Sequence, residues 1–160
     1  MKGVIAEAAT KFVESRIVEG ENLKTDLISK LDEMLKIVAF IEEKSPEIIT
    51  DYKARLMERV NELAANAQID EQRIATEVTL FADKVCVDEE IVRLKSHITN
   101  MIQLLNEGGF IGRKLDFIAQ EMNREANTIL SKMNDISIVN KAIDLKTDIE
   151  KVREQIQNIE

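Results

Sequence analysis

Two glutamates one helical turn apart are the residues of this sequence whose type and spacing best suit a metal ion. Glu121 and Glu125 are four residues apart, which places both carboxylates on one face of an α-helix because each residue turns the helix by about 100°. Such a pair suits a hard divalent cation whose other ligands are water and phosphate oxygens. The spacing is also typical of a solvated acidic flank balanced by Lys114 and Lys132, and the pattern alone favours that interpretation.

His97 is the only histidine in the chain. Imidazole gains and loses a proton near neutral pH, so His97 is a candidate general acid or base. It is predicted at the edge of an apolar helical stripe, near Glu90 and Arg93. That position also fits a half-buried histidine held by Glu90 or Arg93, and the pattern alone somewhat favours this structural role.

A local excess of cations lies in the same part of the chain. The net charge of -8 argues against indiscriminate adhesion to nucleic acid or to membranes, which are both anionic. Residues 108–133 reverse this sign, so an anion site is expected there. Four cations, Arg113, Lys114, Arg124 and Lys132, stand there against three acids, Asp116, Glu121 and Glu125. Projection on a helix places Asp116 and Gln120 on the flank opposite Glu125.

Several other functions lack their sequence signature. There is no Walker loop, dinucleotide fingerprint or cysteine–histidine zinc spacing. Aromatic residues make up 4% of the chain with no tryptophan, so stacking platforms for unpaired bases are expected to be scarce. No apolar run approaches a membrane span, and no signal peptide is recognised. Cys86 is the single cysteine, which leaves no internal disulfide partner and predicts a reducing, cytoplasmic location.

These candidate residues must be positioned by helices. Apolar residues recur at steps of three and four throughout, without strand-like alternation, and 5 glycines and 1 proline are too few for a sandwich or barrel. The sequence therefore predicts an all-α fold, a helical bundle forming a single domain over residues 1–160. Pro46 is expected to end one helix and begin the next, so that residues 20–67 form a long projecting helical hairpin.

The helix boundaries further along the chain follow from local signals. Asp70 and Asp88 are expected N-caps, and the Gly108-Gly109 pair is expected to end a helix by adopting left-handed backbone angles. Further apolar stripes begin at Leu115 and Leu145, whereas residues 1–18 carry only a modest one.

Several motifs in the second half resemble the YicC/YloC family. The strongest is GRKLDF at 112–117, followed by QEMNREANT at 120–128 and by Ser131 and Lys132. Residues 88–97 resemble the family's acidic helix ending in histidine, and residues 145–160 resemble its C-terminus. A weaker motif comprises Arg16, Glu19, Gly20 and Leu23. The resemblance spans nearly the whole chain and is most specific over 71–160.

The resemblance implies a fold, an activity and partners. Family members are stress-associated bacterial endoribonucleases that assemble as hexamers and enclose RNA. They usually carry an additional N-terminal domain of comparable size, so this chain is expected to be the C-terminal helical half without that domain. Metal-dependent hydrolysis of RNA is then the implied function, with RNA and further copies of the chain as partners and no membrane partner.

The resemblance also implies roles for individual residues. Glu121 and Glu125 would hold a divalent ion, Mg²⁺ or Mn²⁺, and His97 would be the general acid or base. The residues expected to hold RNA phosphates are Arg113, Lys114, Arg124 and Lys132. The supporting residues are Glu90, Arg93, Asp116 and Gln120, where Asp116 either serves the site of another subunit or pins Arg113 and Arg124.

Three alternatives to this function stay open. The chain could be a helical oligomerisation module, an RNA-binding module without activity of its own, or a generic coiled-coil adaptor, because helical periodicity is common to all of them.

Overall fold

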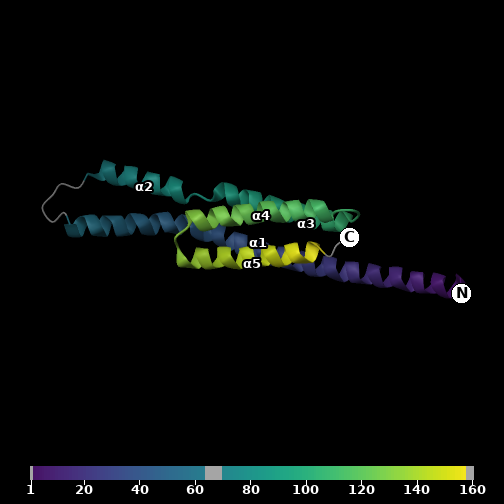
Figure 1. Cartoon of the computed structure of the whole chain (residues 1–160). Helices are drawn as coiled ribbons and strands as arrows, with labels where there is room; N and C mark the ends of the chain where they lie inside the picture. Colours follow the sequence, from purple (N-terminus) through teal and green to yellow (C-terminus); the bar gives the residue numbers. More distant parts are fainter. Residues whose placement is uncertain (1, 64–69, 158–160) are drawn as a thin grey trace.

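Five α-helices make up the part of the chain that the structure describes. The computed structural model describes residues 2–63 and 70–157, and no strand occurs within these ranges. The helices are α1 (Lys2–Leu63), α2 (Glu71–Val85), α3 (Asp88–Glu107), α4 (Gly112–Lys132) and α5 (Ile136–Ile156), shown in Figure 1. The predicted all-α fold class is confirmed.

The bundle is built around the middle of the long helix α1. Helices α3 and α5 pack against α1, and α4 packs against both α3 and α5. Figure 1 shows α1 running the length of the molecule, with its N-terminal end extending beyond the bundle at one end. At the other end, the last part of α1 runs beside α2.

Apolar stripes from four helices form one continuous core. Leu27, Leu31, Met34, Val38 and Ile41 of α1 are fully buried, as their three- and four-residue spacing predicts. Each such side chain contributes about 1.5–3 kcal/mol when it leaves water. The facing residues include Leu94, Ile98 and Met101 of α3, Leu115, Met122 and Ile129 of α4, and Leu145, Ile149 and Val152 of α5.

The predicted helix break at Pro46 is wrong. Helix α1 continues through Pro46, although proline lacks the N–H donor of the helical ladder and crowds the preceding turn. Ile41 and Ile48 are buried on either side of it, and the Ser45 hydroxyl donates a hydrogen bond to the Ile41 carbonyl at 2.6 Å. Packing on both sides thus stabilises the helix across the proline.

A shorter projecting hairpin replaces the predicted one at 20–67. It consists of the last part of α1 and helix α2, where the rings of Tyr52 and Phe81 stack with centroids 3.8 Å apart. Residues 64–67 of the predicted hairpin lie outside the described residues.

The predicted helix ends are mostly confirmed. Asp70 caps α2 by accepting hydrogen bonds from the backbone of Gln72 and Arg73. Gly108 and Gly109 end α3 with positive φ angles of 72° and 87°. The prediction for Asp88 is wrong, because Asp88 is already the first residue of α3 and Val87 precedes it without a side-chain cap.

No helix within the described ranges is both long enough and apolar enough to cross a membrane.

Candidate metal centre between α3 and α4

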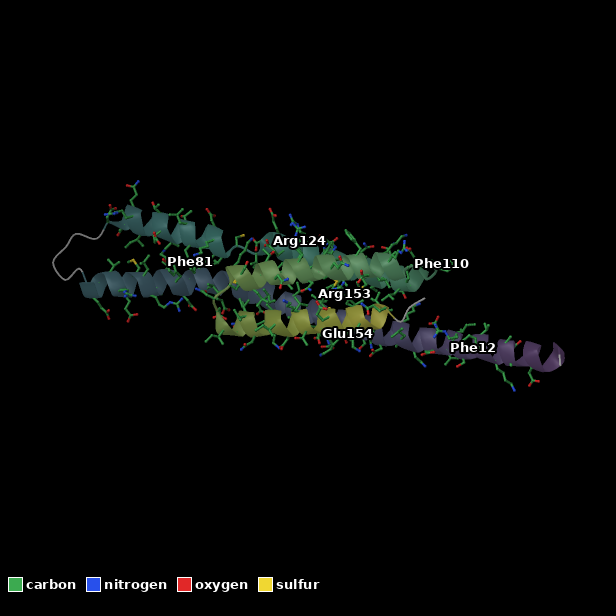
Figure 2. The ribbon with its side chains drawn as sticks, viewed as in Figure 1. Phe12, Phe81, Phe110, Arg124, Arg153 and Glu154 are labelled. Atoms are coloured by element: carbon green, nitrogen blue, oxygen red, sulfur yellow. The ribbon has the colours of Figure 1, made fainter. Side chains whose placement is uncertain are left out.

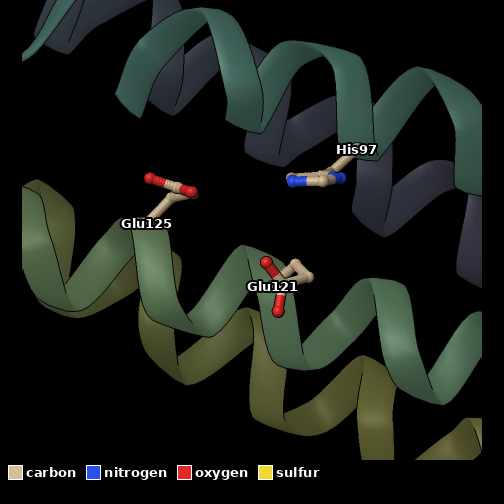
Figure 3. A group of neighbouring side chains, drawn as sticks. All are labelled: His97, Glu121 and Glu125. Atoms are coloured by element: carbon tan, nitrogen blue, oxygen red, sulfur yellow. The ribbon is translucent and has the colours of Figure 1, made fainter. Parts of the chain in front are cut away.

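One histidine and two glutamates face one another across the seam between α3 and α4. The buried stripes of the two helices fix their rotation, and His97 on α3 and Glu121 and Glu125 on α4 lie at the edge of this packed seam (Figure 3). The structure therefore brings together the three residues predicted as catalytic or metal-binding. They come from separate helices joined by the turn at Gly108-Gly109.

The geometry of this cluster fits a metal ion. Each of the three residues offers one ligand atom, and these atoms all lie within 4.8 Å of one another. Ligand atoms that share one ion at about 2.0–2.2 Å are roughly 3 to 4 Å apart, so small side-chain rotations suffice to close the site. One imidazole nitrogen and two carboxylate oxygens form a donor set that suits Mn²⁺ and other first-row divalent ions as well as Mg²⁺.

The two carboxylates are only loosely compensated by cations of the protein. Glu125 is 4% exposed, and its Oε1 lies 3.5 Å from Nη1 of Arg93, which also binds Glu89 at 3.1 Å. Glu121 lies 3.8 Å from Arg124. A buried carboxylate is costly unless a cation or hydrogen bonds accompany it. These long ion pairs leave both carboxylates able to bind a further cation.

A second polar pair lies on the same seam. Lys132 Nζ lies 2.8 Å from Oε1 of Glu90 and donates to the carbonyl oxygen of Cys86 at 2.9 Å. Glu90 is buried, and its Oε2 has no hydrogen-bond partner among the described residues. The Lys132 ammonium group is thus engaged within the protein. That Lys132 binds RNA phosphates stays a prediction, and it requires this ammonium group to leave or to share its present partners.

Asp116 and Gln120 lie on the flank of α4 opposite Glu125, as the helical projection predicts, and the structure shows that this flank faces α5. Asp116 accepts hydrogen bonds from Nε of Arg153 at 2.9 Å and from the amide of Gln120 at 2.7 Å. The hydrogen bond to Asp116 raises the pKa of Arg153. Within the described ranges Asp116 therefore pairs with Arg153, and the predicted pinning of Arg113 and Arg124 is not found. A role of Asp116 in the site of another subunit stays a prediction.

A polar groove of about 570 Å³ lies along this flank. It is lined by Gln120, Asn123, Arg124, Asn127, Thr128, Ser131 and Arg153. Asn123 donates to Glu150 at 2.6 Å, and Lys146 donates to Asn127 at 2.8 Å. The sequence analysis did not identify Asn123, Asn127 or Arg153 as site residues. The amide side chains at 120, 123 and 127 are spaced by three and four residues, and this spacing in the sequence could have indicated a polar surface on one side of α4.

The remaining predicted cations lie on the outside of α4. Arg113 and Lys114 are exposed in the first turn of the helix. Arg124 is also exposed, two turns before the end of the helix. Three of the four predicted phosphate ligands are therefore available on the surface.

This arrangement defines the class of protein as an all-α bundle with a carboxylate–histidine candidate metal centre and an exposed group of cations beside it. The family described as "Endoribonuclease YicC-like, C-terminal" matches residues 41–160, and the chain belongs to this family. The predicted family resemblance is thereby confirmed.

Two curated relatives show how much of a longer protein the chain covers. It is 44% identical over 157 residues to the probable endoribonuclease YicC of Clostridioides difficile (strain 630), covering 98% of this chain and 54% of the relative. It is 38% identical over 151 residues to the probable endoribonuclease YicC of Haemophilus influenzae (strain ATCC 51907 / DSM 11121 / KW20 / Rd), covering 94% of this chain and 52% of the relative. The chain thus spans about half the length of both curated relatives.

Proposed function

We propose that this chain forms the metal-binding and RNA-contacting part of an endoribonuclease that hydrolyses RNA with the help of a divalent ion. The observation that carries the proposal is the convergence of His97, Glu121 and Glu125 from two helices. The relatives named as probable endoribonucleases support the choice of RNA as the substrate.

Each of the three residues has a role that its position allows. Glu121 and Glu125 hold the ion, with Glu125 fixed by its burial in the seam. A divalent ion bound there supplies Lewis acidity and a water molecule that is readily deprotonated. His97 either exchanges a proton with the reacting groups or completes the ligand set, because a nitrogen of its ring lies within 4.8 Å of an oxygen of each carboxylate.

The exposed cations of α4 hold the substrate. Arg113, Lys114 and Arg124 bind phosphates of the RNA backbone, which predicts binding that weakens with salt and depends little on sequence. Because the seam with its two glutamates adjoins these cations on the same helix, a phosphodiester held by them lies near the candidate metal centre.

The test combines metal binding with RNA cleavage. Mn²⁺ binding is measured by isothermal titration calorimetry, and cleavage of a structured RNA is followed with Mg²⁺, Mn²⁺ or EDTA. The double variant Glu121→Gln/Glu125→Gln is expected to lose both. The matched control is Glu58→Gln/Glu62→Gln, an exposed pair with the same spacing on α1, and it is expected to keep both.

Two results would contradict the proposal. Cleavage that continues unchanged in EDTA would remove the metal from the reaction. Mn²⁺ binding that is equal in the Glu121/Glu125 double variant and the unaltered chain would place the ion elsewhere. This result holds whether or not the chain by itself cleaves RNA.

Exposed apolar side chains near the N-terminal end of α1 favour self-association as a second function. Phe12, Val13, Ile17 and Val18 are all more than half exposed on the part of α1 that extends beyond the bundle (Figure 2). Contiguous exposed apolar residues of this kind mark interaction surfaces, and a homo-oligomer such as the expected hexamer would bury them. Light scattering of the chain and of Phe12→Ala/Ile17→Ala tests this, because the double variant is expected to form smaller species.

A further inference from the structure

We infer that the outer side of α4 binds an unpaired segment of RNA, whose bases stack on Phe110 and Phe117. This surface, called the outer ridge below, consists of Phe110, Arg113, Phe117 and Arg124. The inference rests on the proposed function, and it specifies which form of RNA the site takes.

Two phenylalanine rings are exposed on this side of the bundle. Phe110 is 104% exposed and Phe117 is 62% exposed. Phe110 follows the turn made by Gly108 and Gly109, where the Ile111 amide donates to the Gly109 carbonyl at 3.0 Å. Exposed aromatic faces are the surfaces on which unpaired bases stack. The scarcity of aromatic residues in the sequence therefore did not prevent a stacking surface.

On α4, Arg113 and Arg124 lie on the same side of the helix as Phe117, and Phe110 precedes the helix. Arg113 precedes Phe117 by four residues and Arg124 follows it by seven, so the three side chains leave the helix within about 40° of one another. Arg124 is 74% exposed on its side chain, and its pair with Glu121 is long at 3.8 Å. Figure 2 shows Phe110 at the turn between α3 and α4 and Arg124 further along α4. Aromatic faces together with phosphate-binding cations are typical of surfaces for single-stranded nucleic acid.

The outer ridge also leads to the candidate metal centre. Glu121 follows Phe117 by four residues, one turn or about 6 Å further along the axis. A nucleotide stacked on Phe117 therefore has its phosphate beside the Glu121 carboxylate.

The aromatic contacts require unpaired RNA. In a duplex the faces of the bases are covered by their neighbours in the stack, and only edges, sugars and phosphates are available. Stacking on Phe110 and Phe117 thus selects loops, ends or single strands.

Charge favours RNA over a second copy of the chain as the occupant. Two identical outer ridges would bring Arg113 and Arg124 of one copy against the same cations of the other. Like charges in contact oppose such an arrangement, whereas the RNA backbone is complementary to it.

Fluorescence anisotropy in EDTA, which prevents metal-dependent cleavage, tests the inference. The probe is a short fluorescein-labelled RNA without self-complementarity, used alone or annealed to its complement. Phe110→Ala and Phe117→Ala are each expected to weaken binding of the single strand by about five-fold or more. Duplex binding is expected to stay unchanged, and Phe117→Trp should keep the affinity for the single strand. Leu80→Ala removes an exposed large apolar side chain of α2, outside the outer ridge, and serves as the matched control.

Several outcomes would overturn the inference. These are no binding of the single strand by the unaltered chain at low salt, an equal loss for the duplex, an equal loss in Leu80→Ala, and full binding by Phe110→Ala/Phe117→Ala. A change of oligomeric state in that double variant, seen by light scattering, would instead assign the rings to contacts between copies. If the unaltered chain binds the single strand as expected but its RNA cleavage does not depend on a metal ion, that result contradicts the proposed function and leaves this inference standing.

Discussion

Oε1 of Glu125 lies 3.5 Å from Nη1 of Arg93, although the Glu125 side chain is 5% exposed and the Arg93 side chain is 54% exposed. A half-exposed guanidinium on α3 thus supplies the nearest cation to a carboxylate buried on α4. Since Arg93 is also bound to Glu89, it is shared between two acids. A metal ion at the candidate centre would compete with Arg93 for the negative charge of Glu125.

We predict that Arg93→Ala binds Mn²⁺ more tightly than the unaltered chain, by several-fold and up to about ten-fold, because a competing positive charge is removed. Isothermal titration calorimetry measures this, with Arg55→Ala on the exposed side of α1 as the control. Weaker binding of Mn²⁺ by Arg93→Ala would show that Arg93 orients Glu125 for the ion.

The Glu90–Lys132 pair is expected to act on stability. Lys132→Ala leaves Glu90 buried with no cation, and since Lys132 is itself one-third exposed we expect a loss of about 2–3 kcal/mol in the free energy of unfolding. Urea denaturation measures this. Lys114→Ala, an exposed lysine on the same helix, should change stability by about 0.5 kcal/mol or less.

A double variant separates the cost of leaving the Glu90 carboxylate unpaired from the cost of losing the packing of the Lys132 side chain. Glu90→Leu/Lys132→Met replaces both charges with apolar groups and should recover most of the stability lost in Lys132→Ala. Equal stability of Lys132→Ala and Lys114→Ala would contradict the importance of this pair.

The N-cap of α5 should make stability depend on acid pH. Asp135 accepts hydrogen bonds from the hydroxyl of Ser137 and from the backbone N–H groups of Ser137 and Ile138, and these bonds lower the pKa of its carboxyl below 3.8. A lowered pKa in the folded state means that this stabilisation is present above pH 3.8 and is lost as the pH falls through the folded-state pKa.

Asp135→Ala is therefore expected to lose about 1 kcal/mol at neutral pH. The difference from the unaltered chain should shrink below pH 3.8. Denaturation at a series of pH values measures it, and Asp135→Asn should stay close to the unaltered chain at neutral pH because asparagine is also a good N-cap. A difference that grows on acidification would contradict this account.

Replacement of Pro46 is expected to stabilise the long helix. Pro46→Ala restores an N–H donor to the turn inside α1 and removes the crowding caused by the ring, while the gain in unfolded-state entropy offsets part of the effect. We expect a net rise of about 1–2 kcal/mol in the free energy of unfolding. Chemical denaturation checks this, and a loss of stability would show that α1 is built around the proline.

The positions of most core residues follow from the sequence alone. Leu27, Leu31 and Met34 are fully buried, as their spacing predicts, because helical periodicity is a local property that neighbouring residues carry themselves. The cap at Asp70 and the helix end at Gly108 follow for the same reason. The opposed flanks of Asp116 and Glu125 could also be predicted, since both residues belong to one helix.

Tertiary packing decided those features of the fold and of the site that the local sequence pattern leaves undetermined. Pro46 remains within a helix because buried residues on both sides of it pack against other helices, and that energy is absent from the local sequence. The pattern alone favoured a structural role for His97 and a solvated flank for Glu121 and Glu125. Only the docking of α3 on α4 brings the three within 4.8 Å of one another, because contacts between separate helices depend on the rotation and register that the whole core imposes.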